Sequence, residues 1–197
     1  MTGVDFSDEA ISLARSLSKE LGIKADFICS DIYDLPKVLN KKFDIVFTSR
    51  GVLCWLPDLK KWAEVISHFL KRGGIFCIVE GHPFMMVFDD ARDARELKLR
   101  YTYFHKPGPD KWEPQGGDYA DKDAKIVHPS YEWSHKLSDI VNALIGAGLR
   151  IEFLHELPFI TYQQFPFMEQ DKDGAWRLDG DNIPLTFSLK ATKTRLR

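Results

Sequence analysis

The sequence predicts an α/β fold built on a mostly parallel sheet. Short runs of consecutive apolar residues alternate with segments in which apolar residues recur every three or four positions. The runs are typical of strands covered on both faces, and the periodic segments are typical of amphipathic helices. Their alternation indicates strand–helix–strand crossovers, which connect parallel strands.

The first part of the chain carries this alternation most clearly. Residues 2–5 form the end of a strand, and Ser7 then caps a helix that Gly22 ends. Strands follow at 25–29 and at 43–48, where the apolar runs are short and compact. These segments predict the amino-terminal part of a layered sheet.

The next helix and strand continue the pattern. Pro57 and Asp58 begin a helix whose apolar stripe runs to Leu70. Gly73 and Gly74 are expected to end it, and a buried strand is expected over 75–80.

Two insertions interrupt the later part of the chain, at about 84–133 and 158–184. The charged segment 85–104 predicts an amphipathic helix, whereas the remainder of the first insertion is rich in Pro, Gly, Asp and Lys and indicates a loop. Loops of this length are uncommon and usually act as lids or binding loops. Aromatic side chains in both insertions either line an acceptor pocket or attach the loops to the core.

The last predicted elements complete a single domain over residues 1–197. A helix at 137–145 and strands at 151–156 and 185–191 flank the second insertion. This length corresponds to about one domain, and no internal repeat divides it.

Composition excludes several classes of protein. Lys and Arg number 27 against 29 Asp and Glu, so the net charge of −2 disfavours a nucleic-acid partner. No apolar run approaches the ~18 residues of a membrane span, and residues 1–5 do not predict a signal peptide. Three cysteines without a CxxC pair fit a reducing cytoplasm, and the scattered histidines do not predict a metal site. No feature indicates an oligomeric state.

Polar residues follow two predicted strands at the edge where open α/β sheets bind ligands. Asp5 can accept hydrogen bonds from both hydroxyls of a ribose, and Asp31 can accept one from an adenine amino group, with Ile32 beside the ring. Each also has a simpler interpretation, because Asp5 can begin a helix and Asp31 can belong to an ordinary turn.

Two further segments lie after the next strands. The strand at 43–48 leads into Ser49, Arg50 and Gly51, and the strand at 75–80 leads into Gly81 and His82. Each signal is weak by itself, but the order and spacing of the four segments are more specific.

This combination resembles the class I S-adenosylmethionine-dependent methyltransferases, in particular the small-molecule enzymes of bacterial type. The resemblance runs from Thr2 to Lys193 and includes the closing pair of strands. It implies a Rossmann-like sheet whose last strand is antiparallel, S-adenosylmethionine as the cofactor, and methyl transfer to a small-molecule acceptor.

The resemblance also assigns roles to individual positions. Asp5 would hold the ribose, Phe6 would pack near the adenine that Asp31 and Ile32 flank, and the strand end at 49–51 would line the methionine end. The implied cofactor-binding residues are Asp5, Phe6, Asp31, Ile32, Ser49, Arg50 and Gly51.

Acceptor binding and proton transfer have their own candidates. His82, at a strand tip, is the first candidate for a catalytic base, and His135 and Glu132 are alternatives, because histidine titrates near neutral pH. A lone histidine is nevertheless more often a packing residue. The predicted acceptor-binding residues are Leu53, Trp55, Tyr131, Trp133 and His135.

One part of the family pattern is missing from this sequence. No GxGxG loop is present, and the segment 2–5 matches the family's second strand rather than its first. We therefore expect a truncated form that lacks the first strand and binds cofactor poorly; a rival interpretation has another chain complete the sheet. A non-catalytic domain and, less favoured, a nicotinamide-dependent oxidoreductase are the alternative functions.

Overall fold

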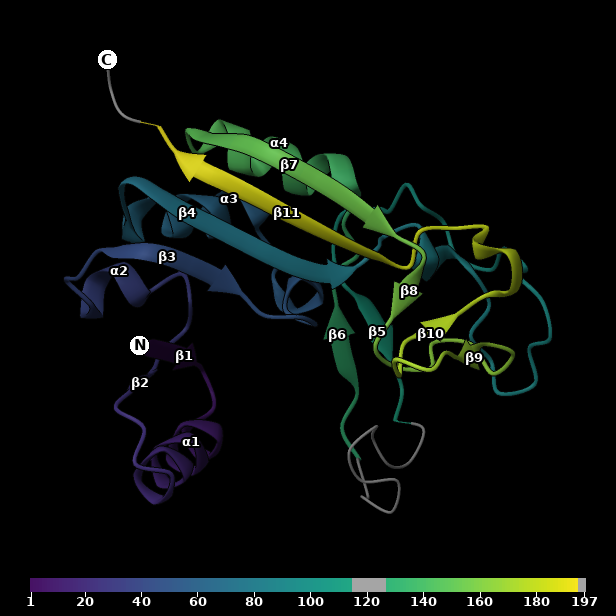
Figure 1. Ribbon diagram of the computed structural model, residues 1–197, viewed down its shortest axis with the longest axis horizontal. Helices are drawn as coiled ribbons and strands as arrows, with labels where there is room; N and C mark the ends of the chain where they lie inside the picture. Colours follow the sequence, from purple (N-terminus) through teal and green to yellow (C-terminus); the bar gives the residue numbers. More distant parts are fainter. Residues whose placement is uncertain (115–126, 195–197) are drawn as a thin grey trace.

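Two groups of strands form the sheet layer of the computed structural model, which describes residues 1–114 and 127–194 (Figure 1). The first group is a parallel pair, β1 (Thr2–Asp5) and β2 (Asp26–Cys29), joined by α1 (Asp8–Glu20). Within the described residues β1 pairs with β2 alone, so its other edge is free.

The second group is a four-stranded sheet in the order β3-β4-β11-β7. β3 and β4 are parallel, whereas β11 is antiparallel to both of its neighbours. The predicted antiparallel last strand is therefore confirmed. The strands of this sheet are β3 (Phe43–Thr48), β4 (Leu70–Gly81), β11 (Thr186–Lys193) and β7 (Leu149–Leu157).

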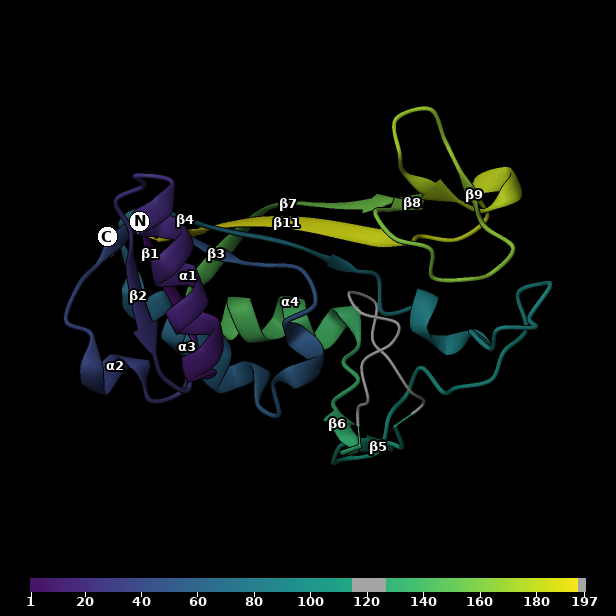
Figure 2. The ribbon, with the colours of Figure 1, turned by 90° about the horizontal axis from the view of Figure 1, so that it is seen from below.

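Three further helices accompany these strands: α2 (Leu35–Val38), α3 (Leu59–Phe69) and α4 (Leu137–Gly146). α3 and α4 lie together on one face of the four-stranded sheet (Figure 2). Trp62 of α3 meets Phe76 of β4 edge to face, with ring centroids 5.6 Å apart. This side of the sheet contains the main core.

The opposite face of the sheet is open at β3. Ile45 and Phe47 project from it and are 62% and 60% exposed. Val46, between them, packs toward the core on the helix-covered side. The apolar run that predicted a strand covered on both faces is thus covered on one face only in the described residues.

α1 forms as predicted, with the Ser7 hydroxyl accepting a hydrogen bond from the Ala10 N–H at 3.1 Å. Ile11 of this helix is buried, whereas Leu13, Leu17 and Leu21 are exposed. The helix therefore presents a second uncovered apolar surface beside the β1–β2 pair.

The junction between α3 and β4 differs from the prediction. The helix ends at Phe69 and β4 begins at once at Leu70, so the two glycines lie within the strand and do not terminate the helix. A Cβ on Gly74 would lie 2.9 Å from the carbonyl oxygen of Lys71 and 3.1 Å from that of Asp44. A glycine is needed there because β3 and the start of β4 approach closely.

The helix predicted over 85–104 is wrong. One short 3₁₀ turn, Met85–Val87, forms at its start, and the chain then folds back so that Phe88 bridges Leu99. Asp89 stabilises this reversal by accepting a hydrogen bond from Arg100 at 2.7 Å. Local ion pairing and burial of the turn override the helical periodicity.

The remainder of the first insertion contributes a small antiparallel pair, β5 (Asp110–Trp112) and β6 (Ser130–Glu132). The part of this insertion at 115–126 lies outside the described residues.

The second insertion folds into a small three-stranded sheet with a core of its own. Its elements are β8 (Phe159–Ile160), β9 (Glu169–Gln170), β10 (Trp176–Arg177) and the turn η3 (Asp179–Asp181), with strand order β8-β10-β9. Phe165 of this insertion packs with Met85 and Val87 of the first, and all three are buried. These residues attach the insertions to each other, in a cluster separate from the main core, which the sequence did not predict.

Candidate functional site

The carboxyl ends of β1 and β2 bring two predicted carboxylates to one edge. Asp5 pairs in register with Cys29, and the Ser30 N–H donates to the Asp5 carbonyl at 2.9 Å. One oxygen of Asp5 accepts from the Ser7 N–H, and one oxygen of Asp31 accepts from the Tyr33 N–H, each at 2.8 Å. Both side chains are exposed, and each keeps its second oxygen available for a ligand.

Apolar surface lies beside these carboxylates. Phe6 follows Asp5 directly, and its side chain is 80% exposed. Ile32, next to Asp31, is half-buried and packs on the core. The edge therefore combines hydrogen-bond acceptors with an open apolar ring, which are the features that an adenosine group needs.

The loop after β3 contains Ser49, Arg50 and Gly51 and is held by a residue that the prediction did not use. Glu80, at the end of β4, accepts hydrogen bonds from the backbone N–H groups of Gly51 and Val52 at 2.8 and 3.0 Å. Its position at a strand tip was the available sequence signal, but its partners 28 and 29 residues away were not evident.

Arg50 connects this loop to the second insertion. Its guanidinium donates a hydrogen bond to the Thr161 hydroxyl. The next residue, Tyr162, lies close to Gly81 and Glu80, and burial, aided by the charge of Glu80, raises the pKa of its phenol to about 12. The phenol is therefore neutral at physiological pH. Sequence reasoning placed Tyr162 among the insertion aromatics without assigning it to the site.

His82, the first candidate for a base, is buried with both ring nitrogens engaged. Nε2 lies 2.8 Å from a Glu156 oxygen, and Nδ1 accepts a hydrogen bond from the Phe84 N–H at 3.1 Å. Burial lowers the pKa of His82, and the adjacent Glu156 offsets this only in part. This geometry gives His82 no free lone pair with which to take a proton, and it favours a structural role.

The first three predicted acceptor residues differ in exposure. Leu53, in the 3₁₀ turn η1 (Leu53–Trp55), is buried in the main core and does not face an open surface. Trp55, in the same turn, is half exposed. Tyr131 lies on β6 opposite Lys111, where it is also half exposed.

Trp133 and His135 are brought against η1 and the residue that follows it. The Trp133 N–H donates to the Cys54 carbonyl at 2.8 Å, and His135 Nε2 lies 2.8 Å from the Leu56 carbonyl. Burial lowers the pKa of His135, and burial likewise raises the pKa of Glu132. Burial thus disfavours the charged forms of both side chains at this junction.

A pocket of about 220 Å³ opens at this junction. It is lined by Pro57, His105, Lys106, Pro107, Gly108, Trp133, Ser134, His135, Lys136 and Asp139. Two predicted acceptor residues, Trp133 and His135, are among them.

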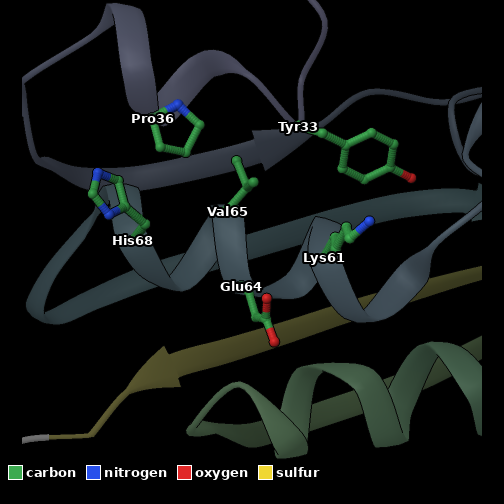
Figure 3. A pocket seen from close by; sticks show the side chains of 6 residues that line it. All are labelled: Tyr33, Pro36, Lys61, Glu64, Val65 and His68. Carbon is green, nitrogen blue, oxygen red and sulfur yellow. The ribbon is translucent and has the colours of Figure 1, made fainter.

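A larger pocket of about 380 Å³ lies between α2 and α3 (Figure 3). It is lined by Tyr33, Pro36, Lys61, Glu64, Val65 and His68. The Tyr33 hydroxyl is already paired with both backbone groups of Asp58. None of the predicted site residues lines this pocket, so its size does not make it the candidate site.

The described residues contain no group of three or more metal-ligating side chains. No helix in that part of the chain is long and apolar enough to cross a membrane.

Comparison with known families decides the class of this protein. A model described as a methyltransferase domain matches residues 1–114, more than half of the chain. The chain belongs to the class I S-adenosylmethionine-dependent methyltransferases. The nicotinamide-dependent oxidoreductase alternative is therefore wrong. A search of curated proteins finds no match to this methyltransferase.

Solved structures resemble this methyltransferase over almost its whole length. An S-adenosylmethionine-dependent methyltransferase from Clostridium acetobutylicum is 19% identical, with 98% of this chain and 75% of that chain covered and a TM-score of 0.61. One from Mesorhizobium loti is 20% identical, with 97% and 79% covered and a TM-score of 0.63. Geranyl diphosphate C-methyltransferase from Streptomyces coelicolor A3(2) is 15% identical, with 98% and 63% covered and a TM-score of 0.55. These likenesses establish the fold.

The residues present fit one half of the family's cofactor. Asp5 and Asp31 each have a free carboxylate oxygen that would suit the ribose hydroxyls and the adenine amino group, and Phe6 has an exposed apolar ring. The loop containing Arg50 and Gly51 is the described segment that suits the methionine half.

Proposed function

We propose that this methyltransferase transfers the methyl group of S-adenosylmethionine to a small-molecule acceptor. The observation that carries the proposal is the convergence of Asp5 and Asp31 at one sheet edge, each with a free carboxylate oxygen. The cofactor supplies the activated methyl group, and the protein supplies orientation, which contributes ~7–11 kcal/mol in favourable cases. The free thiols Cys29, Cys54 and Cys77 support a reducing, cytoplasmic location.

A small molecule is the acceptor class that the site favours. The pocket at the η1 junction is lined partly by Trp133 and His135, and its volume of about 220 Å³, below the ~300–1,000 Å³ usual for ligand pockets, suits only a small acceptor group. One of the similar structures is geranyl diphosphate C-methyltransferase, whose name indicates a small-molecule acceptor. The net charge of −2 does not support a nucleic-acid acceptor.

Trp133 provides the test of the acceptor site. Trp133→Ala should weaken acceptor binding more than S-adenosylhomocysteine binding, because the side chain lines the pocket away from the carboxylate edge. Equal loss of both affinities would assign Trp133 a structural role.

Proton transfer is required only when the acceptor must lose a proton. His135 lines the acceptor pocket, and burial favours the neutral ring that a base needs, but its Nε2 already pairs with the Leu56 carbonyl, so only Nδ1 is a candidate for accepting a proton. The predicted role of His82 has less support, because Glu156 and Phe84 occupy its ring nitrogens.

We also propose that an additional parallel strand, with the glycine-rich loop of the family, pairs with the free edges of β1 and β3. Both strands have a free edge within the described residues. Exposed Ile45 and Phe47 on β3, and Leu17 on α1, supply apolar surface for it and for a following helix. Unpaired strand edges otherwise favour aggregation.

Calorimetry with S-adenosylhomocysteine tests both parts of this proposal. A longer chain, extended at its amino end by a strand and a GxGxG segment, should bind, and the present chain should bind weakly or not at all. Failure of both to bind would support a non-catalytic domain. An upstream reading frame without a strand and a GxGxG segment would contradict the completing strand.

A further inference from the structure

The side chain of Glu80 joins the ends of two neighbouring strands. Its Oε1 accepts hydrogen bonds from the N–H groups of Gly51 at 2.8 Å and of Gly81 at 2.9 Å, and its Oε2 accepts one from Val52 at 3.0 Å. Hydrogen bonds to an ionised carboxylate are shorter and stronger than those between neutral groups. One half-buried side chain thus binds three backbone donors from two segments of the chain.

The loop that Glu80 binds has a conformation that needs such support. Gly51 has a φ of +75°, in the left-handed region that favours glycine. The Gly51 and Val52 N–H groups point to the Glu80 carboxylate instead of to a neighbouring strand. Without that carboxylate, these two donors would have no described protein partner.

The same loop carries Arg50 to the second insertion. The Arg50 guanidinium bonds to the Thr161 hydroxyl, 111 residues away in sequence. Tyr162, the next residue, places its phenol oxygen 3.9 Å from the position of a Cβ on Gly81. The end of β4, the loop after β3 and the second insertion therefore meet around Glu80.

We propose that Glu80 is a positioning residue that fixes the loop 49–52, so that Arg50 and Gly51 are presented to the methionine end of the cofactor. The inference rests on the proposed function and on the family resemblance, which implies that residues 49–51 line the methionine end of the cofactor. Glu80 acts through the backbone of the loop, and its carboxylate oxygens are already engaged by N–H groups.

Hydrogen exchange in the unliganded chain tests the positioning directly. In Glu80→Ala, the Gly51 and Val52 amides should exchange about tenfold faster or more, because they lose their acceptor. Glu80→Gln keeps a carbonyl oxygen for Gly51 but turns its NH₂ group toward the Val52 N–H, so Val52 should be affected more than Gly51. Glu64→Ala, a change of an exposed glutamate on α3, is the matched control and should leave both amides unchanged.

Calorimetry on the same variants of the longer chain links the loop to the cofactor. Glu80→Ala should raise the Kd for S-adenosylhomocysteine about tenfold or more, since misplaced binding groups lose that much in favourable cases. Glu80→Gln should show a smaller increase, and Glu64→Ala should show none.

The two measurements separate failure of this inference from failure of the proposed function. A wild-type chain that binds no S-adenosylhomocysteine contradicts the proposed function. Hydrogen exchange still tests, in that case, whether Glu80 holds the loop 49–52. Unchanged exchange at Gly51 and Val52 in Glu80→Ala overturns the inference. Faster exchange with an unchanged Kd in a chain that binds also overturns it, because the loop would then not serve the cofactor.

Discussion

At the residue scale, burial decides what each titratable side chain can do. His82 was the first candidate for a base, yet its ring is buried between Glu156 and the Phe84 N–H. His135 is also partly buried, but it lines a pocket. A sequence shows that a histidine follows a strand, whereas the partners of its two nitrogens depend on β7 and on the turn after β4.

The pH dependence of stability should report the burial of His82. Burial lowers its pKa in the folded chain below the unfolded value of ~6.5, so the unfolded chain binds the proton more readily. Its contribution to stability is present above pH ~6.5 and is lost as the pH falls through the lower folded pKa. Thermal unfolding at pH 7 and pH 5 should therefore show a smaller decrease in stability at pH 5 for His82→Gln than for the wild type.

His128→Gln is the control for that measurement, because His128 is exposed. The control should lose as much stability between pH 7 and pH 5 as the wild type does. An equal decrease in stability at pH 5 for His82→Gln and the wild type would contradict the prediction that the buried His82 makes stability depend on pH.

Gly51 gives a second residue-scale prediction. Gly51→Ala should lower the free energy of unfolding by ~1 kcal/mol, because φ is +75° and an alanine is strained there. Gly22→Ala is a matched control: its φ is +65°, and at both positions an added Cβ has nothing within 4 Å. Only Gly51→Ala should also weaken S-adenosylhomocysteine binding in calorimetry. Equal affinities of the two variants would show that the loop 49–52 does not contact the cofactor.

At the element scale, the β1–α1–β2 unit depends on few buried contacts. Val4 and Ile28 pack on Leu35, Val65 and Phe69. The free edge of β1 has no strand partner among the described residues. This unit should open more readily than the four-stranded sheet.

Hydrogen exchange tests this difference between elements. Amides of β1 and β2 should exchange faster than those of β4 and β11, because local opening requires less free energy where buried contacts are few. β11 is paired on both sides, with β4 and with β7. Equal exchange rates for the amides of β1 and β2 and those of β4 and β11 would contradict this prediction. They would show that the β1–α1–β2 unit opens together with the four-stranded sheet.

The exposed face of β3 predicts self-association. Ile45 and Phe47 are both more than half exposed beside a free strand edge. Replacing both by lysine should reduce concentration-dependent association in analytical ultracentrifugation and change stability by less than ~1 kcal/mol, because little burial is lost. A wild-type chain that stays monomeric at high concentration would contradict the prediction.

At the scale of the whole molecule, regular elements could be predicted and the insertions could not. α1 and β3 follow from Ser7, Gly22 and a compact apolar run, which are local signals. The helix expected over 85–104 failed because the Phe88–Leu99 bridge and the Asp89–Arg100 pair are tertiary features. Periodicity does not reveal which contacts will compete with it.

The candidate site divides in the same way. Asp5 and Asp31 could be placed from sequence because the ends of parallel strands meet at one edge. The contacts of Glu80 with Gly51 and of Arg50 with Thr161 depend on strand pairing and on the fold of the second insertion. The burial of Leu53 could not be predicted, because it depends on how η1 turns this side chain into the core.

The most direct test of the account is calorimetric titration of S-adenosylhomocysteine into the longer chain and its Asp5→Ala variant. Asp26→Ala is the control, since Asp26 lies at the amino end of β2, the opposite end of the same strand pair. The wild type and Asp26→Ala should bind alike, and Asp5→Ala should bind about tenfold more weakly, as expected for a lost hydrogen bond to a charged group. Equal affinities of Asp5→Ala and the wild type, or no binding by the wild type, would contradict this prediction.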